Sequence, residues 1–303
     1  MKRKPNAVPG GSPRPLDRMK NKKKAAQNLM REEYKVRAMT EASASYKSQA
    51  KLTAMQSGKR PEDVEQSGTS IFDPVLCELV YRWFCPSGGS ILDPFAGGSV
   101  RGVVAGQCGF DYHGVDLSAR QLAANEKQAK DICIGDKMPR WSRGDSREIA
   151  TIAPGEYDLV FSCPPYGDLE VYSEDAADIS TMSHADFLAA YRIIIAQAVG
   201  MLKPDRFACF VVGDFRDKEG FYRNFVGDTI AAFQDAGATL YNEAILVTAV
   251  GSLPIRVGRM FVNGRKLGKT HQNVLVFFNG DPKSIKSWDV PDFGKLETPD
   301  IEP

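Results

Sequence analysis

The sequence predicts an α/β fold whose mostly parallel sheet carries helices on both faces. The chain of 303 residues is 43% hydrophobic, which is enough to bury a sizeable core. From about residue 71, short apolar runs of strand length alternate with longer segments of helical periodicity. This alternation is typical of parallel strands joined by helical crossovers. Two β-rich runs come last, and we expect them to close the sheet as an antiparallel pair.

The expected elements follow one another along the chain in that alternation. The last two strands are expected at 242–250 and 272–278, with a long loop containing Pro254 and several glycines between them. The earlier strands are expected at 90–92, 112–115, 141–143, 157–162 and 207–212, and the helices at 100–107, 118–130, 184–202 and 222–236.

The N-terminal part of the chain has a different composition. Residues 1–60 hold 16 Lys and Arg against 4 Asp and Glu, a balance of +12, so the remaining residues carry +1 − 12 = −11. We expect a basic, partly disordered and partly helical arm at 1–68, a main domain at 69–282 and a tail at 283–303. A basic arm on an acidic body predicts a polyanionic partner, and a solubilising tail is the alternative.

Several protein classes are disfavoured by composition. No stretch approaches the roughly 18 consecutive apolar residues that a membrane helix requires, so neither a membrane partner nor a location other than the cytoplasm is expected. The six cysteines include no CxxC pair, and the chain has three histidines. The sequence therefore predicts neither a disulfide framework nor a metal site.

A glycine-rich turn follows the first expected strand in "ILDPFAGGSVRGVVAG" (91–106). The turn lacks both the GxGxxG fingerprint and the Gly-Lys-Ser/Thr of a phosphate loop. Asp93 would repel a pyrophosphate but attract an ammonium or sulfonium cation, and Gly97 and Gly98 let the backbone approach a bulky ligand.

Two further acids follow the next two strands. Asp116, 23 residues after Asp93, can accept hydrogen bonds from ribose hydroxyls. Asp145 could meet an adenine amino group. Each acid alone is also explained as a helix cap or a solvated turn. Together the three acids predict a pocket for a positively charged adenosine, and S-adenosylmethionine is the ligand that fits.

The strand at 157–162 ends in Ser162-Cys163-Pro164-Pro165-Tyr166. The two prolines remove N–H groups from the turn and leave carbonyls that can only accept hydrogen bonds. An exocyclic amine of a nucleobase has hydrogens to donate to such carbonyls, which would place its lone pair in line with a methyl group. Tyr166 could stack on that base, which must first be flipped out of its duplex.

These motifs carry a family resemblance. "DPFAGGS" followed about 70 residues later by "SCPPY" resembles the amino-group (N4-cytosine/N6-adenine) DNA methyltransferases, and "KTHQNVLVFFNG" (269–280) is similar to their closing strand. "CPPYGDLEVYSEDAADIS" further resembles methylases of bacteriophage and prophage genomes. The resemblance implies the Rossmann-like methyltransferase fold with a seven-stranded sheet, S-adenosylmethionine as cofactor and double-stranded DNA as partner. It implies cofactor contacts at Phe72, Pro74, Asp93, Pro94, Phe95, Ala96, Gly97, Asp116 and Asp145, and a catalytic turn of Ser162, Cys163, Pro164, Pro165 and Tyr166.

The catalytic turn departs from the family pattern. Cys163 stands where the family has Asp, Asn or Ser, and a thiol is a poor acceptor, so the polar role stays open between Ser162, Cys163 and Glu170. The target base therefore stays open between cytosine and adenine. Three alternatives also stay open: C5-cytosine methylation through Cys163, methylation of RNA or of a protein amide, and a catalytically inactive DNA-binding protein.

Substrate recognition is expected from two loops, because only about 65 residues separate the two motifs. One is acidic and follows the catalytic turn, with Glu170 and Tyr172 as contacts to the base. The other is basic and is expected to reach phosphates and guanine edges. Its candidate residues are Arg256, Arg259, Arg265, Lys266, Lys269 and His271.

Overall fold

The computed structural model describes residues 72–289 apart from 134–136, 168–171, 174 and 248–252, and for 253–256 it describes the backbone alone. The predicted arm at 1–68 lies outside the described residues, as do Glu170 and the side chain of Arg256. Among the described residues, no helix is both long and apolar enough to cross a membrane.

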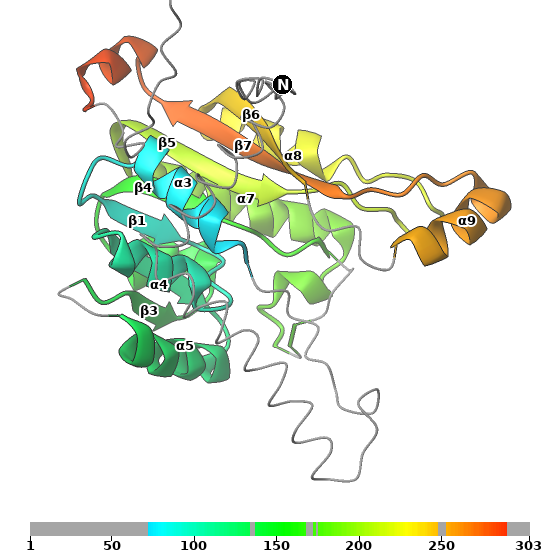
Figure 1. Ribbon diagram of the computed structural model, residues 1–303, viewed down its shortest axis with the longest axis horizontal. Coiled ribbons are helices and arrows are strands. Elements are labelled where there is room, and N and C mark those ends of the chain that lie inside the picture. Colours follow the sequence, from blue (N-terminus) through cyan, green and yellow to red (C-terminus); the bar gives the residue numbers. More distant parts are fainter. Residues whose placement is uncertain (1–71, 134–136, 168–171, 174, 248–252, 290–303) are drawn as a thin grey trace, which may run out of the picture. The chain divides into compact units, whose positions relative to one another are not determined.

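The described residues form a seven-stranded sheet in the order β3-β2-β1-β4-β5-β7-β6 (Figure 1). Strands β1 to β5 are mutually parallel, and β7 runs antiparallel to both β5 and β6. The predicted α/β fold and its antiparallel closing pair are thus confirmed. The strands are β1 (Ser90–Asp93), β2 (Asp111–Asp116), β3 (Arg140–Arg143), β4 (Tyr157–Ser162), β5 (Leu202–Val212), β6 (Thr239–Val247) and β7 (His271–Asn279).

Helices cover both faces of the sheet in two groups (Figure 1). One group is α3 (Pro74–Phe84), α4 (Val100–Gln107) and α5 (Ala119–Ile132). The other is η1 (Ser146–Glu148), α6 (Ile149–Ile152), α7 (His184–Gly200) and α8 (Phe225–Asp235), with the short η3 (Ile179–Thr181) beside α7. Local chemistry sets several helix starts, since the side chains of Asp73, Ser118 and Ser183 accept hydrogen bonds from the first turns of α3, α5 and α7.

The core lies between the central strands and the two helical layers. All six residues of β4 are buried, as expected for a parallel strand covered on both faces. On the α7 and α8 side, Phe233 and Phe277 stack with ring centroids 3.9 Å apart. The central position of β4 means that the chain following Ser162 emerges in the middle of the sheet edge.

The structure corrects three expectations about the elements. The loop expected between the last two strands contains helix α9 (Leu253–Gly264). Strand β5 begins at Leu202, five residues earlier than expected, because pairing with β4 continues across Pro204 through an irregularity. The expected tail begins with η4 (Pro282–Ser287), after which Trp288 packs edge-on against Phe207 with centroids 5.4 Å apart.

One buried histidine predicts a pH dependence of stability. His113 on β2 is 8% exposed and its ring nitrogens hydrogen-bond to Ser142 Oγ (2.8 Å) and Tyr157 Oη (3.2 Å). Burial, with a smaller effect of Arg140, lowers the pKa of His113 to about 4. The unfolded chain has the ordinary pKa of about 6.5 and so binds more protons between these values.

We expect the free energy of unfolding to fall by up to about 3 kcal/mol from this group as the pH decreases from 6.5 to 4. The measurement is urea unfolding at pH 7, 5.5 and 4.5, for the natural chain and for His113→Gln. The variant should show a shallower pH dependence over that window. Parallel curves for the two proteins would contradict the assignment.

Candidate active site

The two sequence motifs meet at the carboxyl ends of β1 and β4. These strands are parallel neighbours, with Ile91 paired to Leu159, so Asp93 and Ser162 end side by side. Ser162 Oγ donates a 2.5 Å hydrogen bond to Asp93 Oδ1 and accepts one of 3.2 Å from the backbone N–H of Phe95. The glycine turn and the catalytic turn are therefore joined by a direct hydrogen bond.

A buried ion pair lies beneath this junction. The Asp93 carboxylate is fully buried, and its Oδ2 accepts hydrogen bonds from Arg101 Nε (2.6 Å) and Tyr112 Oη (2.7 Å). Burial alone would lower the pKa of Arg101, but the Asp93 carboxylate raises it above its ordinary value. Arg101 also lies over the ring of Phe72, 4.8 Å from its centroid. Asp93 is thus paired with a cation of the protein itself, and its contact with a cofactor cation stays a prediction.

The backbone of the glycine turn is held at almost every polar atom. Arg101 Nη2 donates to the carbonyls of Phe95 (2.5 Å) and Ala96 (3.0 Å). The remaining bonds run from Ser146 Oγ to Pro94 O (2.5 Å), from Ala96 N to Val115 O (3.0 Å), from Gly97 N to Asp116 Oδ2 (2.9 Å) and from Asn125 Nδ2 to Gly97 O (2.7 Å). Since the N–H groups of residues 95–97 are all used within the protein, this turn is not an anion cradle.

Asp116 is the acid best placed for a ribose. Its half-buried carboxylate ends β2 and accepts the N–H groups of Gly97 and Ser118 (2.8 Å), which leaves lone pairs for further donors. Burial raises the pKa of Asp116. Next to it, Gly97 has φ +50° and a Cβ on Gly98 would meet no atom within 4 Å. The turn thus borders open space, and these residues fit a nucleoside at this edge of the sheet.

Asp145 is held by its own turn. It caps η1 by accepting the N–H of Arg147 (2.9 Å), and its Oδ2 lies 2.6 Å from Arg147 Nη2. Asp145 follows β3 by two residues, so its position agrees with the expected strand end. A contact with adenine stays a prediction.

The remaining candidate cofactor residues lie around the glycine turn. Phe72 packs edge-on against Phe161 of β4 (5.8 Å between centroids), and Pro74 is the first residue of α3. The ring of Phe95 lies against Tyr191 and Phe210, so its side chain belongs to the core and its backbone to the turn. Cofactor contacts of Phe72 and Pro74 stay predictions.

The catalytic turn places a tyrosine between a thiol and an amide. Tyr166 is half-buried, and its ring meets Phe215 and Phe225 edge-on with centroids 6.3 and 6.1 Å away. Its hydroxyl accepts a hydrogen bond from Gln272 Nε2 and forms a side-chain hydrogen bond with Cys163. Burial is the main cause that raises the pKa of Tyr166 well above its usual range. Pro164 is buried, while Cys163 and Pro165 are half-buried.

These contacts bear on which residue takes the polar role that Asp, Asn or Ser has in the family motif. Ser162 is fully buried and hydrogen-bonded to Asp93 and Phe95, and its role in place of the family's Asp, Asn or Ser stays a prediction. Gln272 was missed by sequence reasoning. Its one signal was its position in the "KTHQ" segment at the start of the expected closing strand.

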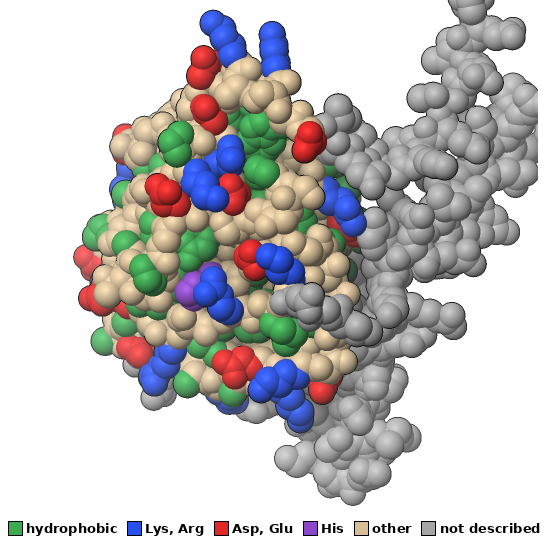
Figure 2. All heavy atoms as spheres, turned by 90° about the vertical axis from the view of Figure 1, so that its left-hand side faces the viewer, with side chains coloured by type: hydrophobic (Ala, Val, Ile, Leu, Met, Phe, Trp, Pro, Cys, Tyr) green, Lys and Arg blue, Asp and Glu red, His purple; other side chains and the backbone are tan. Residues whose placement is uncertain are grey.

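The predicted basic residues run from α9 to the start of β7: Arg259 is in α9, Arg265, Lys266 and Lys269 are on the connection, and His271 begins β7. Arg259, Arg265 and His271 are exposed, and Arg265 lies over the ring of Phe261 at 5.1 Å. Lys266 and Lys269 are half-buried. This connection projects at the carboxyl ends of the parallel strands (Figure 1). On the face seen from the other end of the sheet, positive and negative side chains are interspersed (Figure 2).

Tyr172 is the described member of the acidic loop that was predicted to touch the base. It is 58% exposed, and its backbone N–H donates to Ser180 Oγ (3.3 Å). Its contact with a base stays a prediction.

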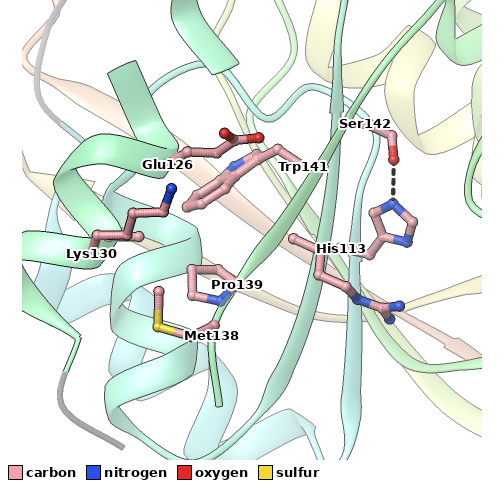
Figure 3. Close-up of a pocket in the computed structure, with 9 residues that line it drawn as sticks. His113, Glu126, Lys130, Met138, Pro139, Trp141 and Ser142 are labelled. Carbon is pink, nitrogen blue, oxygen red and sulfur yellow. Dashed lines mark hydrogen bonds between the residues drawn. The ribbon is translucent and has the colours of Figure 1, made fainter. Parts of the chain in front are cut away.

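A pocket on the β3 edge is separate from the two turns (Figure 3). Trp141 and Pro139 line it together with Glu126 and Lys130 of α5, and the hydrogen bond between His113 and Ser142 lies at its other side. None of the sequence-predicted site residues lines it. It is therefore not the site that the motifs build.

Comparisons with known proteins give structural neighbours of low sequence identity. No protein-family model matches the sequence, and no curated protein sequence is significantly similar to it. The structure is similar to TrmN from Thermus thermophilus (TM-score 0.46, 16% identity, 69% of this chain and 49% of that chain). It is also similar to magnesium protoporphyrin IX methyltransferase from Synechocystis PCC 6803 with bound SAM (0.43, 13%, 68% and 79%). A methyltransferase from Pyrococcus furiosus matches at 0.45 and 14%, over 71% of this chain and 87% of that chain.

The match spans about half the length of TrmN. Likeness at this level carries no conclusion about activity, and the fold follows from the strand order itself.

The buried pair predicts a large cost for losing the arginine. Arg101→Met leaves the Asp93 carboxylate buried without its cation, which should lower the free energy of unfolding by about 3–5 kcal/mol. Lys137→Met removes a cation from the exposed pair with Asp111 and should cost less than about 1 kcal/mol. Urea unfolding of both variants measures the difference, and equal small losses would contradict a structural role of the pair.

Proposed function

We propose that this protein is an S-adenosylmethionine-dependent methyltransferase that modifies an exocyclic amino group, cytosine N4 or adenine N6, of a base flipped out of DNA. The observation that carries the proposal is the 2.5 Å hydrogen bond from Ser162 to Asp93. It joins a turn suited to a nucleoside and a turn that offers hydrogen-bond acceptors at one edge of the sheet. Methyl transfer requires such adjacency, because donor and acceptor must be held in line.

The residues around the glycine turn fit the cofactor. Asp116 would hold the ribose hydroxyls, Asp145 the adenine amino group, and Phe72 would pack beside them. The cofactor supplies an electrophilic methyl group when bound. Gly97 and Gly98 leave the turn without side chains at these two positions. Side chains there would fill the open space that the cofactor needs.

The catalytic turn fits an amine as the acceptor of the methyl group. Pro164 and Pro165 have no N–H, so the turn presents carbonyl oxygens to the hydrogens of the amine. With both hydrogens accepted, the nitrogen lone pair is directed away from the turn and toward the methyl position. Tyr166 orients the base by contact with its ring.

DNA as the partner is supported by the distribution of charge. The basic residues of the α9–β7 connection stand out on a body that carries −11 outside residues 1–60, by the difference +1 − 12. The connection projects on the same side as the catalytic turn (Figure 1). A cationic projection beside the site would hold a phosphate backbone while a base enters the pocket.

The test is incubation of the full chain with methyl-labelled cofactor and double-stranded DNA, RNA or a protein extract, followed by nucleoside and amino-acid mass spectrometry. We expect label in N4-methylcytosine or N6-methyladenine from DNA. Label found only in RNA or only in protein would mean that this molecule, and not DNA, is the substrate. If no label appears and calorimetry detects no cofactor binding, the proposed methyltransferase activity is overturned.

The role of Cys163 separates amine chemistry from covalent catalysis. In the proposed mechanism the thiol forms no bond to the base, so Cys163→Ala should keep methyl transfer within about tenfold. An enzyme that attacks the base through this thiol would lose essentially all activity and would yield C5-methylcytosine. Single-turnover rates of both proteins, with the product identified by mass spectrometry, distinguish the two. Asp116→Ala is the matched loss-of-function control, because it should weaken cofactor binding.

A further inference from the structure

We propose that Gln272 and Lys269 form, with Tyr166, a subsite for the target nucleotide, in which Gln272 fixes the Tyr166 ring and Lys269 binds a phosphate of the nucleotide that stacks there. This inference rests on the proposed function and deepens it. It assigns two residues of the closing segment to the substrate rather than to the sheet alone, and it singles out Lys269 from the other basic residues of that segment.

Three side chains meet over Gly213, the residue after the end of β5. A Cβ built on Gly213 would lie 3.8 Å from Lys269 Nζ, 3.8 Å from Gln272 Cγ and 3.9 Å from Tyr166 Cε1. Because both atoms lie that close to one point, the ammonium of Lys269 is at most 7.7 Å from Tyr166 Cε1, the sum of the two distances. Segments that are 106 residues apart in sequence thus build one wall beside the catalytic turn.

Gln272 controls the orientation of the aromatic platform. Its side-chain amide donates to the Tyr166 hydroxyl, the atom of that side chain most distant from the backbone. Phe215 and Phe225 contact the ring edge-on but provide no polar anchor. A tyrosine held by ring contacts and by its hydroxyl has one ring plane, and stacking on a base depends on that plane. Gln272 is therefore a positioning residue that acts through Tyr166.

Lys269 offers a positive charge beside this platform. It is half-buried and forms no ion pair with a carboxylate of the described residues. A partly exposed ammonium without a carboxylate partner among the described residues is available to an anion that arrives with the substrate. A flipped nucleotide carries its own phosphates at a fixed distance from the stacked base, so one of them matches a cation placed next to Tyr166. Arg259 and Arg265 are exposed on α9 and after it, where they suit backbone contacts outside the pocket.

The phosphate contact is tested with a duplex oligonucleotide that contains the methylation site, located first by sequencing DNA that the protein has methylated. Lys269→Met should raise KM about tenfold with little change in kcat, and should reduce the slope of log Kd against log salt concentration by about one contact. Lys283→Met in η4 is the matched control and should change neither.

A neutral methylphosphonate identifies the partner of Lys269. It is placed in turn at each phosphate flanking the target base. At one of these positions it should weaken binding of the natural chain but not of Lys269→Met, because the variant has already lost the ion pair between residue 269 and the phosphate. If the methylphosphonate weakens binding equally in the natural chain and in Lys269→Met at both positions, the proposed subsite is overturned, even if methylation itself proceeds. The same coupling on an RNA oligonucleotide and none on DNA would overturn the choice of DNA.

The positioning role of Gln272 is tested by a double-mutant cycle with Tyr166→Phe. Each single variant, Gln272→Leu and Tyr166→Phe, should lower kcat about tenfold or more, and the double variant should lose no more than Tyr166→Phe alone, since that variant already lacks the hydrogen bond to Gln272. Fluorescence of 2-aminopurine at the target position should report weaker stacking in both. Unchanged calorimetric cofactor affinity excludes misfolding. Additive losses would overturn the proposal, whereas loss of cofactor binding in the natural chain would overturn the proposed function instead.

Discussion

The buried pair between Asp93 and Arg101 is the interaction on which the site depends. Arg101 belongs to α4, Asp93 ends β1, Tyr112 reaches the pair from β2 and Ser162 from β4. Isolated, each charge would be costly to bury, so the pair persists because both Asp93 oxygens and the Nε and Nη2 groups of Arg101 have partners. The planar fork of arginine suits this position, since Nε serves the carboxylate while Nη2 serves two carbonyls of the turn. A lysine at position 101 would have one nitrogen for these three acceptors.

This arrangement couples the two halves of the site mechanically. The glycine turn is fixed by Arg101 from below and by Asp116, Ser146 and Asn125 from the neighbouring segments. The catalytic turn is fixed to it through Ser162. A shift of either turn would break hydrogen bonds to a buried carboxylate, so the distance between them is set before any ligand arrives. Such preorganisation is what a reaction governed by placement requires.

In the proposed function, the hydrogen-bond acceptors for the amine belong to the backbone rather than to a side chain. Ser162 is consumed by the junction and Cys163 is engaged with Tyr166, which leaves the proline carbonyls as the natural acceptors for an amine. The aromatic side of the site is then completed by Gln272 from the closing strand. In this view the departure of Cys163 from the family pattern changes the neighbours of Tyr166 more than it changes the acceptor turn.

The sequence by itself determined the part of the fold that depends on residues close together in the chain. Strand β4 was located to the residue, and the alternation of strand and helix predicted the parallel sheet, because apolar periodicity and turn residues depend on nearby positions. The proximity of "DPFAGG" and "SCPPY" also followed, since adjacent parallel strands bring their carboxyl ends together.

Tertiary structure decided the rest. That Arg101 neutralises Asp93, that Ser162 faces inward and that Gln272 reaches Tyr166 depends on how segments 8 to 106 residues apart are placed by strand order and register, which no local pattern encodes. Helix α9 was missed for a related reason, because Pro254 and four glycines in the 251–268 stretch favour a loop when read one position at a time.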